Sequence, residues 1–176
     1  MLAAVVLAAG AASRFGAPKQ RLLLPAVLDA LAAAPVDDVV VVAGAHALDV
    51  AARTVQCPEW ERGPGASLRC GLAALAEDAE AALVVLADGP ALAPAAVARQ
   101  RSATRATGAP IVAASYGGVR GHPLLLARAA WPDVPDEGLR AHDALLVPCD
   151  DLGRPGDVDY PADLPERFRK APREPM

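Results

Sequence analysis

The stretch that most restricts how this chain can fold is residues 3–19, where a short apolar run ends in a loop of small residues. It has the sequence Ala-Ala-Val-Val-Leu-Ala-Ala-Gly-Ala-Ala-Ser-Arg-Phe-Gly-Ala-Pro-Lys. A continuous apolar run bounded by glycine indicates a buried strand of a parallel sheet. Because glycine has no Cβ, the following loop can bring backbone N–H groups close to an anion. Arg14 and Lys19 add positive charge, so we interpret the segment as a triphosphate-binding loop.

Other interpretations of this stretch are weaker. A secretory signal would carry a basic residue before its apolar region, and none precedes this one. A dinucleotide-binding loop would contain Gly-x-Gly-x-x-Gly, which is absent. A Walker loop would continue with Lys and then Ser or Thr, whereas Ala17 follows Gly16. A strand–loop–helix connection without any ligand stays open at this stage.

Strands and helices are expected to alternate along the rest of the chain. Apolar runs predict strands at 39–42, 54–57, 83–86, 111–115 and 145–149. Helices are expected at 26–34 with Pro25 at the first position, 67–79 with Ser67 as N-cap, 94–105 and 162–169, and one or two helical turns at 47–53. The alternation predicts an α/β fold with a mainly parallel sheet, in a single domain over residues 1–170 and a frayed tail at 171–176.

The composition argues against several classes of partner. The net charge of −4 disfavours nucleic acids, which bind to basic faces. No segment approaches the roughly 20 apolar residues that span a bilayer, so we expect no membrane partner. The three cysteines, Cys57, Cys70 and Cys149, are widely spaced and give neither a disulfide framework nor a zinc signature. This pattern leads us to expect a reducing, cytoplasmic location.

Acidic residues follow the predicted strands at places where a metal could bind. Ligands of open parallel sheets bind at the carboxyl ends of the strands. Asp88 lies just past the strand at 83–86, where an isolated charge needs a partner such as a divalent cation. Asp157 and Asp159 point the same way if the backbone is extended, and are candidates for a second carboxylate ligand. For all three residues, a solvated cap of a turn or helix is the alternative.

Two further segments are candidate substrate contacts. Ser67 and Arg69 open a helix whose N-terminus can receive an anion, although an N-cap beside a surface arginine explains them equally well. His122, in Gly-His-Pro, is a candidate contact, with a turn histidine as the alternative. His46 and His142 are expected at the surface, and no Ser/His/Asp or Cys/His catalytic set is discernible.

Taken in order, these motifs resemble the MobA-like nucleotidyltransferases. The signature loop of that family is similar to Leu7-Ala-Ala-Gly10, Arg14-Phe-Gly16 and Lys19-Gln20. Three further segments resemble motifs of the molybdenum cofactor cytidylyltransferase branch. They are Trp60-x-x-Gly63, Ser67-Leu-Arg69-x-Gly71-Leu72 and Leu86-Ala-Asp88-Gly-Pro90. The later motifs follow in the family's order: Gly121-His-Pro123, Asp136-Glu-Gly138-Leu-Arg140 and Asp157-Val-Asp159-Tyr-Pro-Ala-Asp163-Leu.

The resemblance implies a three-layer, Rossmann-like nucleotidyltransferase fold of the GT-A-like kind. It implies that Asp88 and Asp159 hold Mg²⁺ and that His122 and Arg140 contact the acceptor. Nucleotide binding would fall to Leu7, Ala8, Ala9, Gly10, Arg14, Lys19 and Ser67, with Lys19, Arg14 and Asp88 as the catalytic residues. A phosphate oxygen of the acceptor would attack the α-phosphorus of an NTP, releasing pyrophosphate. CTP is favoured, GTP is a close variant, and the acceptor would be of molybdopterin type, with a molybdoenzyme as a further partner.

The chain departs from the family pattern at several positions. The Gly-x-Pro-Leu element is missing, because Leu24-Pro25 leads almost directly into the expected helix. Cys57 stands where the family has Asn, and Ala87 and Gly89 replace Gly and Gln. These departures keep a second hypothesis open, a nucleotide-binding accessory or maturation factor for a molybdoenzyme without turnover. An oxidoreductase is a third hypothesis, which no nicotinamide or flavin fingerprint supports.

Overall fold

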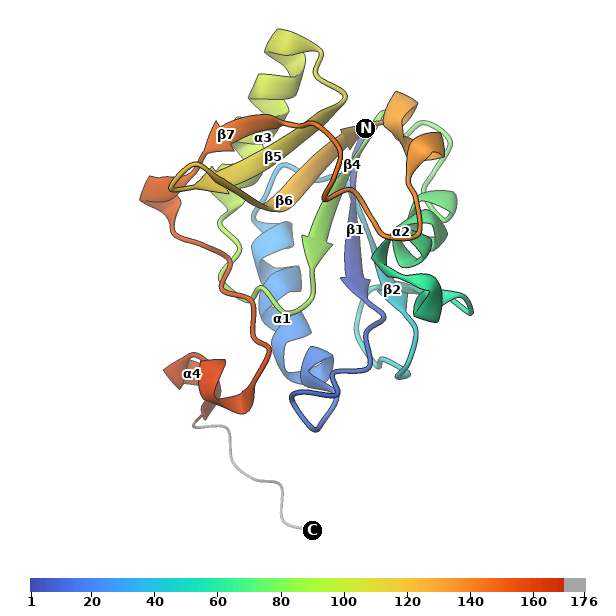
Figure 1. Ribbon diagram of the computed structural model, residues 1–176, viewed down its shortest axis with the longest axis vertical. Helices are drawn as coiled ribbons and strands as arrows, with labels where there is room; N and C mark the ends of the chain where they lie inside the picture. Colours follow the sequence, from blue (N-terminus) through green and yellow to red (C-terminus); the bar gives the residue numbers. More distant parts are fainter. Residues whose placement is uncertain (170–176) are drawn as a thin grey trace.

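The first strand, β1 (Leu2–Ala8), lies inside a seven-stranded sheet with the order β3-β2-β1-β4-β6-β5-β7 (Figure 1). The structure is a computed structural model that describes residues 1–169. The expected tail at 171–176, and the last residue of the expected domain, lie outside the described residues.

The sheet is mainly parallel, as predicted. Strands β2 (Asp38–Ala43) and β4 (Ala81–Leu86) flank β1 in parallel, and β3 (Arg53–Gln56) extends the sheet beyond β2. Strand β6 (Val119–Ala127) runs antiparallel to both of its neighbours, β4 and β5 (Ile111–Tyr116). Strand β7 (Leu145–Pro148) pairs in parallel with β5 at the edge.

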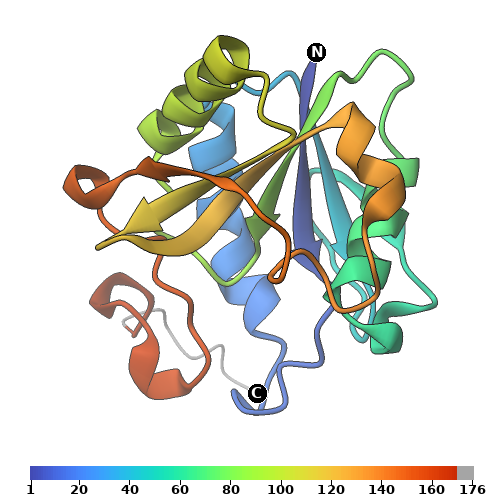
Figure 2. The same cartoon turned by 45° about the horizontal axis from the view of Figure 1, so that its top comes forward.

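Helices cover both faces of the sheet and make three layers (Figure 2). Helices α1 (Lys19–Ala32) and α3 (Pro94–Thr107) share one core with the residues of β1 that point to their side, such as Val6. Helix α2 (Pro64–Ala73) packs on the other face, where Val5 belongs to a second core. Because both faces of the central strands are buried, these strands are continuously apolar and do not alternate.

Helix α1 begins earlier than the sequence predicts. It starts at Lys19, and Pro25 lies within it, so the expected start at Pro25 is wrong. A proline inside a helix costs about 3 kcal/mol. Burial of Leu23, Leu24, Val27 and Leu31, which recur at helical spacing, outweighs that cost.

Three other helical predictions need correction. Helix α2 starts at Pro64, which suits the first turn of a helix, so Ser67 lies inside the helix and is not its N-cap. Residues 47–53 are not helical. The expected helix at 162–169 is divided into a 3₁₀ turn (Pro161–Asp163) and helix α4 (Glu166–Arg169), with Pro165 between them.

The parallel register brings the predicted site segments to one edge of the sheet. Leu7 of β1 pairs with Val42 of β2 and with Leu86 of β4, so the loops that follow these strands leave the same edge. The N-terminus lies at the opposite edge (Figure 1). Within residues 1–169, no helix is long and apolar enough to cross a membrane.

Candidate functional site

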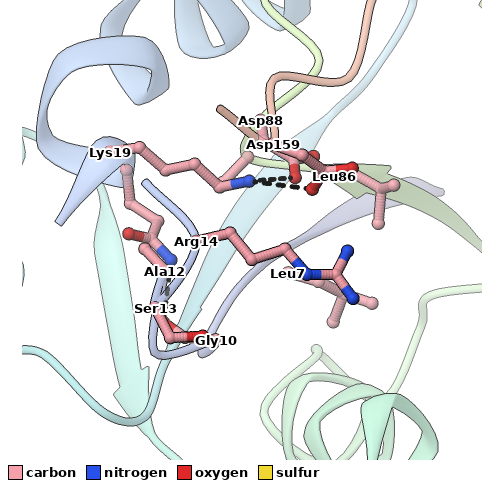
Figure 3. Close-up of a pocket in the computed structure, with 11 residues that line it drawn as sticks. Leu7, Gly10, Ala12, Ser13, Arg14, Lys19, Leu86, Asp88 and Asp159 are labelled. Carbon is pink, nitrogen blue, oxygen red and sulfur yellow. Dashed lines mark hydrogen bonds and ion pairs between the residues drawn. The ribbon is translucent and has the colours of Figure 1, made fainter. Parts of the chain in front are cut away.

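A cleft of about 410 Å³ opens at the carboxyl edge of the sheet, between the ends of β1 and β4 (Figure 3). Three segments line it, namely β1 with its following loop and the start of α1, the end of β4 with the residues just after it, and Asp159. The lining residues are Leu7, Gly10, Ala12, Ser13, Arg14, Lys19, Gln20, Leu86, Ala87, Asp88 and Asp159.

Lys19 is the centre of the polar network in this cleft. Its side chain is only 9% exposed, and its Nζ donates to Asp88 Oδ2 at 2.9 Å and to the backbone carbonyl of Val158. Asp159 Oδ1 lies 3.4 Å from the same Nζ. One ammonium group therefore bridges two carboxylates that are 71 residues apart in the sequence, counted from Asp88 to Asp159.

Backbone hydrogen bonds hold the second carboxylate in place. The Val158 N–H donates to the Asp88 carbonyl at 3.0 Å, and the Ala91 N–H donates to the Pro155 carbonyl at 2.9 Å. The segment 155–159 thus lies along the loop that follows β4. Because Asp159 comes directly after Val158, its position depends on this pairing and not on a contact of its own with the sheet.

A third carboxylate makes this part of the site strongly acidic. Partial desolvation, followed by the negative charges of Asp88 and Asp159, raises the pKa of the Asp157 carboxyl, and Lys19 opposes the shift. A single ammonium does not balance three carboxylates. The donor set suits a hard divalent cation, which prefers carboxylate oxygens and keeps several waters. Within residues 1–169 no group of three or more His, Cys, Asp or Glu side chains is placed to hold a metal ion, so a cation here would depend on phosphate oxygens and water for most of its ligands.

The loop after β1 presents unpaired N–H groups. Its carbonyls are used as acceptors: Ala9 receives the Ala45 N–H at 3.0 Å, Gly10 receives Gln20 Nε2 at 2.9 Å, and Ala12 receives the Phe15 N–H at 3.0 Å. The N–H groups of residues 10–14 donate to no acceptor within residues 1–169. A run of free N–H groups beside a basic side chain can bind an anion, here with Arg14, which also lines the cleft.

The cleft gathers only part of the predicted nucleotide-binding set. Leu7, Gly10, Arg14 and Lys19 line it, whereas Ala8 and Ala9 are buried in the two cores. Ser67 is buried within α2 and does not line the cleft. The N-terminus of α2 already has a backbone partner, because the Gly65 N–H donates to the Asp136 carbonyl at 2.9 Å.

The predicted acceptor residues His122 and Arg140 do not line the cleft, but the charge of Asp88 acts on His122. Burial lowers the pKa of His122 to about 4, and the charge of Asp88 opposes that shift. The positive charges of Arg120 and Arg140 lower the same pKa further. The charges of Asp88, Arg120 and Arg140 therefore all act on His122, and Arg120 is a residue that the sequence reasoning missed. Its position two residues before His122 on β6 was the available signal.

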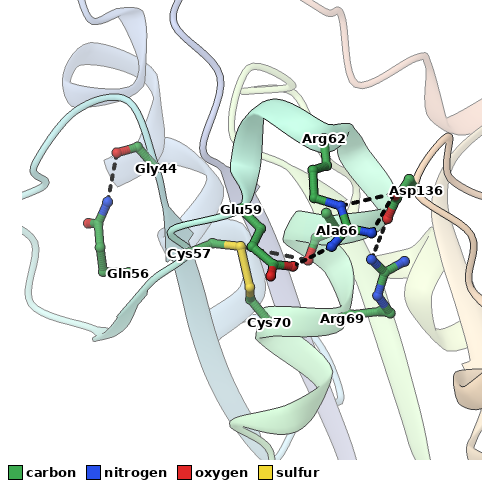
Figure 4. Close-up of a disulfide and its surroundings, with 9 residues drawn as sticks. All are labelled: Gly44, Gln56, Cys57, Glu59, Arg62, Ala66, Arg69, Cys70 and Asp136. Atoms are coloured by element: carbon green, nitrogen blue, oxygen red, sulfur yellow. Dashed lines mark hydrogen bonds and ion pairs between the residues drawn. A yellow bond between two sulfur atoms is a disulfide. The ribbon is translucent and has the colours of Figure 1, made fainter.

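The prediction that the cysteines form no disulfide is wrong. Cys57 and Cys70 are bonded, with their Cα atoms 5.8 Å apart (Figure 4). Their spacing matches no familiar pattern, because folding, and not local sequence, brings the end of β3 against α2. Cys149 is free and buried. The expectation of a cytoplasmic location loses the support that it drew from unpaired cysteines.

Ion pairs beside the disulfide hold the segment around residue 136 on α2. Arg62 Nη2 lies 2.9 Å from Asp136 Oδ2, and Arg69 pairs with Asp136 Oδ1 (Figure 4). These contacts lower the pKa of Asp136 through hydrogen bonds, that from Arg69 first. There is no space for a side chain at Gly65, where a Cβ would lie 1.6 Å from the Pro135 carbonyl oxygen. The segment that carries Arg140 is therefore fixed closely to α2.

The chain matches one known protein family over most of its length. Residues 4–146 match the family model of the MobA-like NTP transferase domain. No match was found among curated proteins.

Solved structures extend the similarity over most of the chain. A homologue of Mycobacterium tuberculosis Rv0371c from Mycobacterium sp. strain JC1 is 26% identical, with a TM-score of 0.76 and 92% of each chain covered. Rv0371c from M. tuberculosis H37Rv is 28% identical with a TM-score of 0.75, over 92% of this chain and 94% of that one. A second Rv0371c structure is a complex with manganese, at 27% identity, a TM-score of 0.72 and coverage of 92% and 95%. A nucleotidyl transferase from Methanothermobacter thermautotroptrophicus shares the fold at 20% identity, with a TM-score of 0.71 and coverage of 93% and 94%.

Proposed function

The chain belongs to the MobA-like NTP transferase family and is a nucleotidyltransferase, and from this premise we propose its substrates and its site. The donor is an NTP, CTP in preference to GTP, and the acceptor is a phosphorylated molecule of molybdopterin type. The metal is Mg²⁺, held by Asp88 and Asp159. The sequence motifs shared with the cytidylyltransferase branch support the choice of CTP and of this acceptor.

One observation carries the proposal, the position of Lys19 Nζ between Asp88 and Asp159 at the mouth of the loop 10–14. The side chain is nearly buried, and its partners come from two separate parts of the chain, the loop after β4 and residues 158–159. A plain structural ion pair would need neither the second carboxylate nor the adjacent row of free N–H groups. Together they form a surface that is positive along the loop and negative at the carboxylates, which suits a triphosphate and its cation.

The loop would bind the phosphates of the donor. Its free N–H groups at residues 10–14 donate to phosphate oxygens, and Arg14 adds a planar, permanently charged donor. Lys19 also lines the cleft, so its ammonium would add a positive charge close to the phosphates. When bound, the divalent cation supplies charge neutralisation at the phosphates.

The reaction that this site supports is an in-line displacement at the α-phosphorus. An acceptor phosphate oxygen forms a new P–O bond there, and the bond to the β-phosphate oxygen breaks, so that pyrophosphate leaves with the bonding electrons. Lys19 and Arg14 would stabilise the negative charge on the phosphate oxygens. Such chemistry depends on positioning and electrostatic stabilisation, which this set of residues can supply without a nucleophile of its own.

Pyrophosphate release tests the proposal. It is measured with each of the four NTPs, Mg²⁺ and molybdopterin-type acceptors, for the wild type and for Lys19→Met and Asp88→Asn. Loss of one charge contact in the transition state costs about 2–4 kcal/mol, so we expect kcat/KM to fall roughly 30- to 1,000-fold. Arg21→Met is the matched control, because Arg21 is a basic residue of the same helix that is exposed outside the cleft.

The outcomes separate the alternatives. A decrease of only a few-fold in both site variants would show that the site assignment is wrong. If calorimetry shows nucleotide binding but no acceptor gives pyrophosphate release, the hypothesis of an enzyme would be rejected in favour of an accessory factor without turnover.

A further inference from the structure

Two side chains outside the proposed chemistry hold the loop that follows β1. They are Gln20, in the first turn of α1, and His46, which comes shortly after β2. We propose that Gln20 and His46 are positioning residues, which orient the peptide groups of residues 10–14 for phosphate binding, and that Gln20 contributes more than His46. The inference rests on the proposed function, and it gives a role to two residues that would not contact the reacting atoms themselves.

The carbonyls of the loop identify these two residues. All four carbonyls of residues 9–12 accept hydrogen bonds, and side chains are the donors to the inner two. Gln20 Nε2 donates to the Gly10 carbonyl at 2.9 Å, and His46 Nε2 lies 2.8 Å from the Ala11 carbonyl oxygen. Because a carbonyl only accepts, His46 must carry its proton on Nε2. The C=O and N–H of a planar trans peptide point in opposite directions, so holding a carbonyl also orients the N–H of the next residue.

The backbone of this loop needs such support. Gly10 is exposed, and because it has no Cβ the peptide that follows it can rotate at little steric cost. That rotation would turn a carbonyl oxygen toward the cleft, where it would repel a phosphate. Ala12 has a φ of 53°, in the left-handed region that side chains other than glycine rarely adopt. A backbone of this kind persists only when its surroundings hold it.

Gln20 is the stronger of the two contacts because it is shielded from water. The residue is 4% exposed, and its Oε1 is buried with no hydrogen-bond partner among the described residues. A buried amide oxygen without a partner costs free energy that an apolar side chain of similar length would avoid. The amide therefore adds little to packing, and its clear contribution is the hydrogen bond that fixes the Gly10 carbonyl.

His46 acts from a segment that is itself closely packed against the loop. The Ala45 N–H donates to the Ala9 carbonyl at 3.0 Å. There is no space for a side chain at Gly44, where a Cβ would lie 2.7 Å from the Ala9 carbonyl oxygen. The His46 side chain itself is partly exposed, so water can replace its hydrogen bond in part. We therefore expect a smaller effect from His46 than from Gln20.

Inorganic tripolyphosphate with Mg²⁺ is the probe, because it presents the phosphates without a base. Its binding is measured by calorimetry at pH 8, where a histidine side chain ordinarily carries no charge. We expect Gln20→Met to weaken binding about 3- to 10-fold, the value of one hydrogen bond, and His46→Phe about twofold. The His46→Phe variant changes a partly exposed side chain, so it keeps the test decisive if Gln20→Met does not fold.

Gln100→Met is the matched control. Gln100 of α3 is also a buried glutamine whose Nε2 donates to a backbone carbonyl, that of Pro123, and whose Oε1 has no partner among the described residues. It does not line the cleft. Loss of a buried amide can lower stability in both glutamine variants, but only Gln20→Met should weaken binding of tripolyphosphate.

Steady-state kinetics distinguish a positioning role from a catalytic one. Gln20→Met should raise KM for CTP and for GTP by the same factor, because the effect acts on the phosphates and not on the base. Once the NTP is saturating, the bound phosphates favour the competent loop conformation, so kcat and KM for the acceptor should stay within about twofold of wild type. A fall in kcat with unchanged KM for the NTP would contradict the positioning role.

The remaining outcomes separate this inference from the proposed function. Equal tripolyphosphate binding in wild type, Gln20→Met and His46→Phe, while pyrophosphate is still released, would overturn the inference and leave the proposed function intact. An equal loss of binding in Gln20→Met and Gln100→Met would also overturn it, because the loss would then come from general destabilisation. Weaker binding in Gln20→Met but not in Gln100→Met, without pyrophosphate release for any acceptor, would support the positioning role and reject the proposed reaction.

Discussion

Reduction of the Cys57–Cys70 disulfide should lower the free energy of unfolding of this protein by an amount that depends on the length of the loop that the bridge closes. The two cysteines are 13 residues apart in the sequence. Closing a loop of this size restricts the unfolded chain, and the loop-entropy relation gives a stabilisation of about 3 kcal/mol. For a chain of this length the entropy of unfolding is about 0.37 kcal/mol per kelvin, so the loss corresponds to roughly 8 °C in Tm.

Thermal unfolding followed by circular dichroism measures the effect, with and without a thiol reductant and for the double variant Cys57→Ser/Cys70→Ser. Cys149→Ser is the control, because it removes a buried free thiol and keeps the bridge, so reduction should lower its Tm by the same amount as in the wild type. Thiol titration in denaturant should give one reactive thiol before reduction and three after it. If the titration gives one thiol but reduction changes Tm by less than about 2 °C, the loop-entropy argument is refuted; three thiols before reduction would refute the bridge itself.

Three further predictions concern the site. Lys19→Met should tighten Mn²⁺ binding in the absence of nucleotide by about tenfold, because the ammonium no longer competes for the two carboxylates; an unchanged Kd by electron paramagnetic resonance would contradict this. The folded-state pKa of His122, about 4, lies below its ordinary value of about 6.5, so the unfolded chain binds the extra proton and stability falls as the pH drops from 6.5 toward 4. In urea unfolding, the free energy of unfolding of the wild type should be about 2 kcal/mol lower at pH 5 than at pH 7, and His122→Gln should lack this decrease. An equal decrease in both proteins would show that it does not come from His122. Gly65→Ala should displace the segment at Pro135, because the new Cβ cannot fit at 1.6 Å from its carbonyl oxygen, and should raise KM for the acceptor more than KM for the NTP; equal KM values for wild type and variant would argue against this coupling.

Much of the fold could be predicted because the strands and their ends are determined by residue types at short spacing. The continuous apolar run of β1, its glycine boundary and the runs of β2 and β4 specify buried parallel strands, and these strands lie where expected. The same reasoning failed at helix α1. A proline there argued for a helix start, whereas burial of the leucine face extended the helix back to Lys19.

Part of the candidate site could also be predicted from the positions of the strand ends. Strand ends of a parallel sheet share one edge, so the loop after β1 and Asp88 could be expected to meet. Ser67 was expected there from its place near a helix start, but the helix begins three residues earlier and buries it. Arg120 was overlooked although it stands two residues before His122, because its lack of a carboxylate partner within residues 1–169 can be seen only in the structure.

The sequence by itself determined the class of the fold, the order of strands and helices, and the loop that can receive phosphates, because these follow from residue types at short spacing. Tertiary structure alone decided which distant groups meet. It placed Lys19 between Asp88 and Asp159, joined Cys57 to Cys70, and left Arg120 partly buried without a carboxylate partner within residues 1–169. Each of these facts depends on distances between segments far apart in the chain, which are set by how the sheet and its helices pack.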